Sequence, residues 1–587
     1  MKLFINRNTI WCDIFVTRLA ELGVRNVCIS PGSRSTPLTL SFASNKSIRC
    51  FPIIDERSSA FFALGIAKKT NSPVAIVTTS GTAVAELYPA IIEAFYQRVP
   101  LIICTADRPS ALRNSGANQT INQNNIYKNH IRYFADAGLP DLKKLSKAKE
   151  LAENAIRCAA FSNRGPVHIN FPFEKPFEPK NYTDKININV IEKIYSKSSF
   201  ELKLKEQSKI NFQSLAKKFS STERGLIIVG YNNYNNDWAK RLVSFSKAFG
   251  YPIYIDGSSS FRCGMHSKEN VIENLIAIIR TKNFQNHYDP KLIIQFGASP
   301  TSNVLLEFFK NSKAEKILVN EFGDRYDPSL TAKTIYTFNP AEFCELLLQK
   351  NQNKNRDSCW LIDFKVMNKI AIELKRRIIE NAKFPFEGRI ISELLNAMPN
   401  KSNLMISNSL PIRDMDFFAT SSYKQINIYT NRGASGIDGI NSTALGIAAV
   451  SKEPTFLLIG DLAFYHDMNG LHNALKYHIP LKIIFINNGG GGIFESLPIS
   501  DYKEYLKENF VTPLELNFPK LVEAYGGHFI RINSWNEFGR QIHSSTKNKR
   551  LTVLEIQTDA KKSKLQREKY WTAVANKITS YINEIKS

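Results

Sequence analysis

The sequence has few cysteines and no long apolar run. Its eight cysteines, at positions 12, 28, 50, 104, 158, 263, 344 and 359, form no Cys-x-x-Cys pair, and its nine histidines form no His-Glu-x-x-His motif. This spacing argues against zinc ribbons, dithiol redox motifs and a disulfide framework. No segment reaches the roughly 18 uninterrupted apolar residues of a membrane span. The first eight residues lose their apolar character too early for a signal peptide. We therefore expect a cytoplasmic protein with no membrane partner.

Acidic residues are scarce relative to basic ones. The chain has 53 Asp and Glu against 77 Lys and Arg, a net charge of +24. Such an excess is one feature of nucleic-acid-binding proteins. Here the basic residues form no tail or long run, and Lys, Asn and Ile are frequent throughout, as a compositional bias would produce. We expect a diffusely basic surface and no nucleic-acid partner.

The length and composition indicate several folded domains. The chain has 587 residues, of which 43% are hydrophobic and 22% charged, which is enough to bury several cores. Short apolar segments alternate with helical ones in three blocks, at 1–185, 209–345 and 360–587. Polar stretches rich in Lys, Asn and Ser separate the blocks. The predicted fold is α/β, with three doubly wound parallel-sheet domains in series.

The predicted strands are short, mostly apolar segments. They cover 26–30, 73–79, 100–105 and 166–171 in the first block, 225–230, 251–256, 291–296 and 316–320 in the second, and 403–407, 425–430, 455–459, 481–487 and 553–557 in the third. Helices are predicted over 82–97 and 467–478.

The most informative motif lies between residues 460 and 494. One predicted strand ends at Gly460-Asp461, and the next ends at Asn487-Asn488, followed by four glycines at 489–492. A right-handed crossover makes the two strands parallel, so Asp461 and Asn488 both lie at carboxyl ends, where open sheets bind ligands. Carboxylate and amide oxygens suit a hard cation such as Mg²⁺, and glycines let a backbone approach a phosphate closely. The alternative for each half is a plain Gly-rich turn between a strand and a helix.

A carboxylate in the first block is the second candidate. Glu56 begins a predicted helix whose apolar face carries Phe61, Leu64 and Ala67. The alternative function for Glu56 is stabilisation of the helix N-terminus through the helix dipole, worth about 0.5 kcal/mol.

Taken together, these motifs resemble thiamin-diphosphate enzymes, which combine Gly-Asp with Asn-Asn at a spacing like the 27 residues between Asp461 and Asn488. More specifically, the chain resembles the 2-succinyl-5-enolpyruvyl-6-hydroxy-3-cyclohexene-1-carboxylate synthase (MenD) family. Most thiamin enzymes have glycine at the position of Leu462. Leucine at this position is similar to the MenD subfamily. The segments that carry the resemblance are 30–37 (SPGSRSTP), 79–82 (TSGT), 105–109 (TADRP), 116–119 (GANQ), 431–439 (NRGASGIDG) and 460–462 (GDL).

The resemblance implies a transferase that uses thiamin diphosphate with Mg²⁺ or Mn²⁺. It implies decarboxylation of 2-oxoglutarate and 1,4-addition of the resulting unit to isochorismate in menaquinone biosynthesis, by a homodimer or homotetramer. Glu56 is then the catalytic residue, hydrogen-bonded to the aminopyrimidine, and Ile437 keeps the cofactor bent. The implied metal ligands are Asp461, Asn488 and Gly490. The implied cofactor-binding residues are Glu56, Ser80, Gly81, Thr82, Gln119, Ser409, Ser435, Ile437, Gly460, Asp461, Leu462, Asn488, Gly490, Gly491 and Ile493.

The resemblance also explains several arginines in loops. Both implied substrates are dicarboxylates, and the guanidinium fork binds a carboxylate through two parallel hydrogen bonds. For Arg108 the alternative is a local ion pair with Asp107. The implied substrate-binding residues are Ser33, Arg34, Arg108, Gln119, Arg413, Arg432 and Phe494.

Two other functions remain open at this point. One is a different thiamin-dependent enzyme, such as an acetolactate synthase, but its small monocarboxylate substrates would not need four arginines. The other is a non-catalytic protein of the same fold that binds partners or RNA through its basic surface. The presence of Glu56, Asp461 and Asn488 argues against it.

Overall fold

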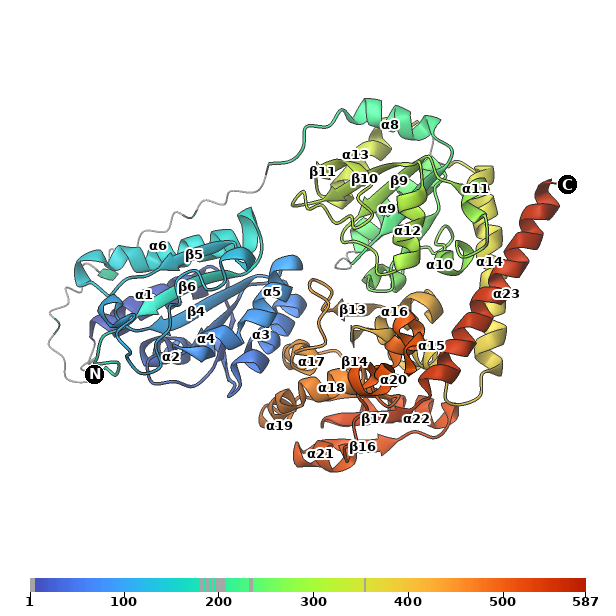
Figure 1. The fold of residues 1–587 in the computed structure, drawn as a ribbon. Coiled ribbons are helices and arrows are strands. Elements are labelled where there is room, and N and C mark those ends of the chain that lie inside the picture. The colour runs from blue at the N-terminus through green and yellow to red at the C-terminus, as the bar shows by residue number, and fades with distance from the viewer. Residues whose placement is uncertain are drawn as a thin grey trace. The chain divides into compact units, whose positions relative to one another are not determined.

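The computed structural model describes residues 6–179, 184, 191–192, 194–195, 200, 206–231, 236–352 and 355–586. The chain divides into two compact units. Figure 1 labels the helices and strands. Unit 1 holds the described residues of 1–205, 431–452 and 463–481, and unit 2 holds those of 206–430, 453–462 and 482–587. The first of three parallel sheets lies in unit 1, and the other two lie in unit 2.

The sheet of unit 1 has six parallel strands in the order β2-β1-β3-β4-β6-β5. Its central strands β3 and β4 are fully buried, because each is mostly apolar and has neighbours on both sides. The strands are β1 (Asn26–Ile29), β2 (Arg49–Pro52), β3 (Val74–Thr78), β4 (Leu101–Asp107), β5 (Tyr133–Asp136) and β6 (Val167–Pro172). The helices are α1 (Arg7–Glu21), α2 (Thr36–Ser44), α3 (Glu56–Thr70), α4 (Thr82–Glu86), α5 (Tyr88–Tyr96) and α6 (Leu145–Ile156).

Two glycines allow a close helix crossing in unit 1. Helix α17 (Ile440–Ala449) packs against α3. A Cβ on Gly65 would lie 2.0 Å from the Thr443 carbonyl oxygen, and a Cβ on Gly446 would lie 2.0 Å from that of Phe62. Larger residues would force the helices apart, so this crossing fixes the helix that begins with Glu56.

The middle sheet has five parallel strands in the order β11-β10-β9-β7-β8. They are β7 (Gly225–Val229), β8 (Ile253–Ile255), β9 (Leu292–Phe296), β10 (Glu315–Asn320) and β11 (Ala332–Thr337). Its helices are α8 (Phe212–Ser221), α9 (Asn236–Phe249), α10 (Leu275–Ile278), α11 (Phe284–Tyr288), α12 (Asn303–Asn311) and α13 (Pro340–Lys350), followed by α14 (Cys359–Asn381).

The third sheet has six strands in the order β13-β12-β14-β15-β17-β16. They are β12 (Ser402–Ile406), β13 (Ile426–Thr430), β14 (Thr455–Gly460), β15 (Leu481–Asn487), β16 (His528–Arg531) and β17 (Thr552–Gln557). The remaining helices of this part of the chain are α15 (Glu387–Ala397), α16 (Leu410–Phe418), α18 (Asp461–His466), α19 (His472–Lys476), α20 (Lys503–Leu506), α21 (Phe518–Ala524), α22 (Trp535–Ser545) and α23 (Ala560–Lys586).

The three-sheet prediction is confirmed, with differences in detail. The helix predicted over 82–97 is two helices, α4 and α5, with Pro89 in the first turn of the second. The helix predicted over 467–478 is wrong at its start. Asp467 is buried there and accepts a hydrogen bond from the Ser442 backbone N–H at 2.7 Å, and a 3₁₀ turn (Met468–Leu471) precedes α19. Strands β5, β11 and β16 were not predicted.

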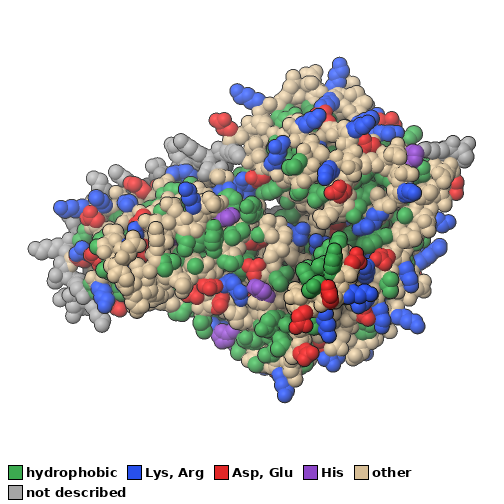
Figure 2. All heavy atoms as spheres, in the orientation of Figure 1, with side chains coloured by type: hydrophobic (Ala, Val, Ile, Leu, Met, Phe, Trp, Pro, Cys, Tyr) green, Lys and Arg blue, Asp and Glu red, His purple; other side chains and the backbone are tan. Residues whose placement is uncertain are grey.

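Basic side chains are dispersed over the visible surface. Figure 2 shows Lys and Arg interspersed with Asp and Glu on the face in view. Ion pairs such as Lys218 with Glu315 and Lys365 with Glu269 join some of them at the surface. This distribution agrees with the expected diffusely basic surface.

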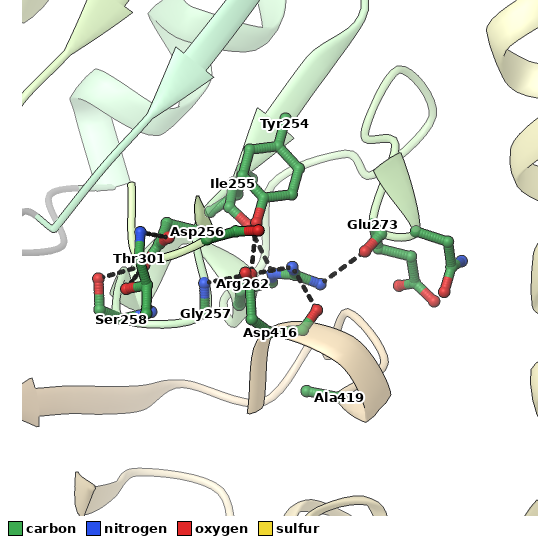
Figure 3. A network of polar contacts seen from close by, with 12 residues as sticks. Tyr254, Ile255, Asp256, Gly257, Ser258, Arg262, Glu273, Thr301, Asp416 and Ala419 are labelled. Atoms are coloured by element: carbon green, nitrogen blue, oxygen red, sulfur yellow. Dashed lines mark hydrogen bonds and ion pairs between the residues drawn. The ribbon is translucent and has the colours of Figure 1, made fainter. Parts of the chain in front are cut away.

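A buried arginine joins the middle sheet to the third within unit 2 (Figure 3). The Arg262 side chain is fully buried. Its Nε donates to the Ile255 carbonyl at 2.6 Å, its Nη1 to that of Glu273 at 3.3 Å, and its Nη2 to Asp416 Oδ1 at 3.2 Å. Since Asp416 lies on α16, this arginine ties that helix to the segment after β8.

Burial of the Asp416 carboxylate is energetically unfavourable. The Tyr254 hydroxyl donates to its Oδ1 at 2.5 Å and the Gly257 N–H at 3.0 Å. Burial and the nearby Asp256 carboxylate raise the pKa of Asp416 to about 7, against the opposing effect of Arg262. The ionised carboxylate therefore depends on the guanidinium for its stability.

We expect the substitution Arg262→Met to lower the free energy of unfolding by about 3–5 kcal/mol, since it leaves a buried carboxylate without its cation. Urea titration at pH 8, above the pKa of Asp416, measures the effect. The control is Lys218→Met, which breaks an exposed ion pair and should cost less than about 1 kcal/mol. Equal losses in both variants would contradict the assigned role of Arg262.

Candidate functional site

The Asp461 carboxylate lies where the sequence predicted it. Strands β14 and β15 are neighbours in the sheet, so Asp461 and Asn488 follow adjacent carboxyl ends. Asp461 is only 3% exposed. The Leu462 N–H donates to its Oδ1 at 2.8 Å and the Gly490 N–H to its Oδ2 at 2.7 Å. Burial raises the pKa of Asp461 to about 6, although these backbone hydrogen bonds oppose the rise.

The Asn488 amide leaves its oxygen open. Its Nδ2 donates to Glu387 Oε1 at 3.0 Å. Its Oδ1 is buried and has no hydrogen-bond partner among the residues that the structure describes. A buried oxygen without a partner is costly unless a ligand takes it. This oxygen and the Asp461 carboxylate follow adjacent strand ends, and oxygen donors of this kind suit Mg²⁺ or Mn²⁺. In the described part of the chain, no group of three or more His, Cys, Asp or Glu side chains could hold a metal.

The four-glycine loop packs tightly against protein backbone. Gly490 has a φ of +121°, and a Cβ there would lie 2.1 Å from the Val511 carbonyl oxygen. A Cβ on Gly491 would lie 2.6 Å from the Phe510 carbonyl oxygen, and the Gly491 N–H donates to Val511 at 2.7 Å. Larger residues would therefore displace the loop that carries Asn488. The half-buried Ile493 and Phe494 follow in the 3₁₀ turn η7 (Gly492–Ser496).

Glu56 is the first residue of α3 in unit 1. Asp55 is the residue that caps this helix, and its Oδ1 accepts from the Ser58 N–H at 2.6 Å. Glu56 is therefore not needed as a cap. Its side chain is half-buried, and burial raises its pKa, with further increases from the Asp55 and Glu86 carboxylates.

Two loops of unit 1, one with Ser80 and one with Gln119, are joined by hydrogen bonds. The Ser80 hydroxyl donates to the Gln119 carbonyl at 3.1 Å, and Gln119 Nε2 donates to the Ser80 carbonyl at 3.0 Å. Gly81, with a φ of +84°, donates its N–H to Gln123 Oε1 at 3.1 Å, and Thr82 begins α4. The structure thus brings together residues that the sequence predicted from separate motifs. The fully buried Gln123 was missed, because no local pattern marks it.

The Asp107 side chain is engaged by residues other than the Arg108 guanidinium. The Asp107 carboxylate forms its ion pair with Arg113 at 3.0 Å and accepts from Asn170 at 2.9 Å. Arg108 is 9% exposed, and its Nη1 is buried with no hydrogen-bond partner in the described residues. The local ion pair therefore does not account for this arginine.

Arg34 has a similar unused donor. Its Nη1 donates to the Phe173 carbonyl at 2.7 Å, and its guanidinium lies 4.8 Å from the centre of the Phe177 ring. Its Nε is buried and, among the described residues, has no partner. Burial and the charge of Arg108 lower its pKa. Two neighbouring guanidinium groups with unused buried donors form a favourable place for a carboxylate.

Of the remaining predicted residues, Ser33, Arg432, Ser435 and Ile437 lie in loops, whereas Arg413, expected in a loop, lies on α16. In unit 1 the exposed Ser33 accepts from the Thr36 hydroxyl at 2.7 Å through its carbonyl. The loop that carries Arg432, Ser435 and Ile437 is held by Glu93, which accepts from the N–H groups of Gly433 and Ala434 at 2.8 and 2.7 Å. In unit 2 Arg413 Nη1 donates to the Ser409 carbonyl at 2.6 Å, and Gly460 ends β14.

The structure thus places the predicted residues in two groups. The group in unit 1 is Ser33, Arg34, Glu56, Ser80, Gly81, Thr82, Arg108, Gln119, Arg432, Ser435 and Ile437. The group in unit 2 is Ser409, Arg413, Gly460, Asp461, Leu462, Asn488, Gly490, Gly491, Ile493 and Phe494. Sequence reasoning missed Glu387, which accepts a hydrogen bond from Asn488, and Arg567, which forms an ion pair with Glu387.

Models of thiamine pyrophosphate enzyme domains match three segments of the chain. The N-terminal TPP binding domain matches residues 12–126, the middle domain matches 194–406, and the C-terminal TPP binding domain matches 418–556. In the described part of the chain, no helix has the length and apolar character needed to cross a membrane.

The chain is also similar to proteins named 2-succinyl-5-enolpyruvyl-6-hydroxy-3-cyclohexene-1-carboxylate synthase. Those of Bacillus cytotoxicus and Geobacillus kaustophilus are each 37% identical over 97% of this chain, and the matches cover 97% and 98% of their own lengths. A protein of the same name from Haloquadratum walsbyi is 35% identical, over 98% of this chain and 99% of its own.

A solved structure, that of benzoylformate decarboxylase from Polynucleobacter necessarius, has a similar fold. The TM-score is 0.69 at 14% identity, over 94% of this chain and 98% of the other.

We expect Asp461→Ala to abolish Mg²⁺-dependent binding of thiamin diphosphate, since the hard cation loses the charged member of its donor pair. Isothermal titration of the full chain with cofactor and Mg²⁺ measures this. The control is Asp501→Ala, which removes an exposed carboxylate and should bind like the wild type. Unchanged affinity in Asp461→Ala would refute the metal assignment.

Proposed function

The chain belongs to the 2-succinyl-5-enolpyruvyl-6-hydroxy-3-cyclohexene-1-carboxylate synthase family of thiamin-diphosphate enzymes, and we propose that it catalyses the reaction of that name in menaquinone biosynthesis. In this reaction 2-oxoglutarate loses CO₂ and the remaining four-carbon unit adds in 1,4 fashion to isochorismate. The observation that carries the proposal is the open oxygen of Asn488, which, like the buried Asp461 carboxylate, follows the carboxyl end of one of two adjacent strands.

Asp461, Asn488 and the Gly490 backbone would hold Mg²⁺ or Mn²⁺, and through it the diphosphate. When bound, thiamin diphosphate supplies the electron sink that allows a 2-oxoacid to lose CO₂. The other residues that would hold it are Ser80, Gly81, Thr82, Gln119, Ser409, Ser435, Ile437, Gly460, Leu462, Gly491 and Ile493. This assignment is supported by the oxygen donors of Asp461 and Asn488 at adjacent strand ends and by the matched thiamine pyrophosphate domains.

Glu56 would exchange a hydrogen-bonded proton with the aminopyrimidine ring. Its raised pKa supports this role, because a carboxyl that protonates more readily donates and accepts a proton near neutral pH more effectively. Helix α3 holds the carboxyl in place through its close crossing with α17.

Arg34 and Arg108 would bind a substrate carboxylate, with Arg413, Arg432, Ser33, Gln119 and Phe494 around the second substrate. The unused buried donors of Arg34 and Arg108 support this assignment. They favour dicarboxylate substrates over the small monocarboxylates of an acetolactate synthase.

The test of this function is product analysis by mass spectrometry with thiamin diphosphate and Mg²⁺. We expect the succinyl-containing adduct from 2-oxoglutarate and isochorismate, and no acetolactate from pyruvate. Acetolactate formation, or no product from the dicarboxylates, would refute the proposal.

In the same assay, Arg108→Lys keeps the charge but loses the planar fork. It should lower kcat/KM by roughly ten- to a hundredfold, about 1.5–3 kcal/mol, while cofactor affinity stays unchanged. A loss of cofactor affinity instead would place Arg108 in the cofactor site.

We also propose a cytoplasmic homodimer or homotetramer, as the family resemblance implies. In this arrangement Glu56 of one chain and Asp461 of another form one site. Glu56→Gln and Asp461→Ala chains should each be inactive alone, and mixing them should restore activity, because each mixed dimer holds one intact site. The readout is turnover after subunit exchange, verified with differently tagged chains. Exchange without recovered activity would show that each site is built within one chain.

A further inference from the structure

We propose that Glu387, held in place by Arg567 of the C-terminal helix, orients the Asn488 amide so that its oxygen faces the metal position. Both are positioning residues. The inference rests on the proposed role of Asn488 as a metal ligand.

The Glu387 carboxylate acts only as an acceptor. It is 2% exposed and begins α15. Its Oε1 accepts from Asn488 Nδ2 at 3.0 Å and from the Thr558 hydroxyl at 2.9 Å, and its Oε2 accepts from Arg567 Nη2 at 2.5 Å. Because a carboxylate that accepts at both oxygens has no proton to give, it can face only the amino end of Asn488. Rotating the amide by half a turn would place oxygen against oxygen.

The hydrogen bond from Asn488 to Glu387 also fixes the orientation of the Asn488 amide oxygen. The Asn488 Oδ1 atom is buried, and no described residue gives it a hydrogen bond. An unrestrained amide would rotate to satisfy such an atom, since the cost of an unpaired buried oxygen is about 1–3 kcal/mol. The Glu387 contact holds the oxygen in an orientation that only a further ligand satisfies.

Arg567 fixes the carboxylate in turn. It is 3% exposed on α23, and it also donates to Asp414 through Nε at 2.8 Å and Nη2 at 2.6 Å. Burial lowers the pKa of Arg567, but the Asp414 and Glu387 carboxylates outweigh this and raise it well above its usual value. The guanidinium is therefore a permanent cation with a fixed geometry.

The same helix holds the loop after Asn488 at a second point. Lys564 Nζ donates to the Glu495 carbonyl at 2.7 Å. A Cβ on Gly492 would lie 3.0 Å from the Ala560 Cβ and 2.6 Å from Asn488 Nδ2. Helix α23 thus restrains segment 488–495 at Asn488, through Glu387, and at Glu495, through Lys564. The helix therefore supports the proposed metal site.

The test exchanges the acceptor and the amide. Glu387→Gln brings a second amide to the contact and allows Asn488 to rotate. Asn488→Asp places two carboxylates against each other. Each single variant should weaken Mn²⁺ binding by about ten- to a hundredfold, as expected for a residue that orients a metal ligand. The double variant restores an amide donating to a carboxylate, so its affinity should return to near the wild-type value.

The measurement is Mn²⁺ affinity by electron paramagnetic resonance, on the full chain with thiamin diphosphate and without substrate. The matched control is Glu273→Gln. Glu273 is another buried carboxylate of unit 2, and its Oε1 pairs with Lys375 Nζ at a distance of 2.9 Å. It should keep wild-type Mn²⁺ affinity. Circular dichroism verifies folding. If Glu387→Gln does not fold, Asn488→Asp decides alone, because a carboxylate would otherwise bind the cation more tightly than an amide.

Three results would overturn the inference: wild-type affinity in folded Glu387→Gln, tighter binding in Asn488→Asp, or no recovery in the double variant. Asp461→Ala separates this failure from that of the proposed function. If Asp461→Ala also keeps wild-type affinity, the metal site itself is wrong. If it alone loses Mn²⁺, only the role of Glu387 is refuted.

Discussion

The arrangement of unit 2 depends on the pairing of one buried guanidinium, that of Arg567, with the carboxylates of Asp414 and Glu387. These residues come from α16, α15 and α23, which are far apart in the sequence. A buried charge of this kind is stable only if its partners remain in place, and loss of one partner typically costs about 3–5 kcal/mol. The pairing therefore links the packing of three helices to the position of Asn488, which hydrogen-bonds to Glu387.

Helix α16 is held by two such arginines. Arg567 binds Asp414, and Arg262, from the middle segment, binds Asp416. Arg413 lies immediately before Asp414 on the same helix. The middle sheet, which contains none of the motifs that carry the resemblance, thus takes part in placing a residue of the proposed substrate site. This gives the middle segment a structural function that does not require it to contact a ligand.

Each unit has predicted site residues with unsatisfied buried polar atoms. Asn488 Oδ1, Arg34 Nε and Arg108 Nη1 are buried without partners among the described residues, as are atoms elsewhere such as Asp416 Oδ2. A ligand is one partner that can satisfy such an atom. One oxygen acceptor suits a cation, and two guanidinium donors suit a carboxylate.

The sequence by itself determined the buried strands and the residues at their ends. Segments such as 456–459 and 483–486 are apolar throughout because both faces are covered, and Asp461 and Asn488 follow them within two residues. Strands β5, β11 and β16 escaped prediction because they are edge strands, whose mostly half-exposed residues leave little hydrophobic pattern. The contacts of Gln123, Glu387 and Arg567 could be decided only by the tertiary structure. Their partners are up to 180 residues away, and no local spacing records which charges a fold will bury together.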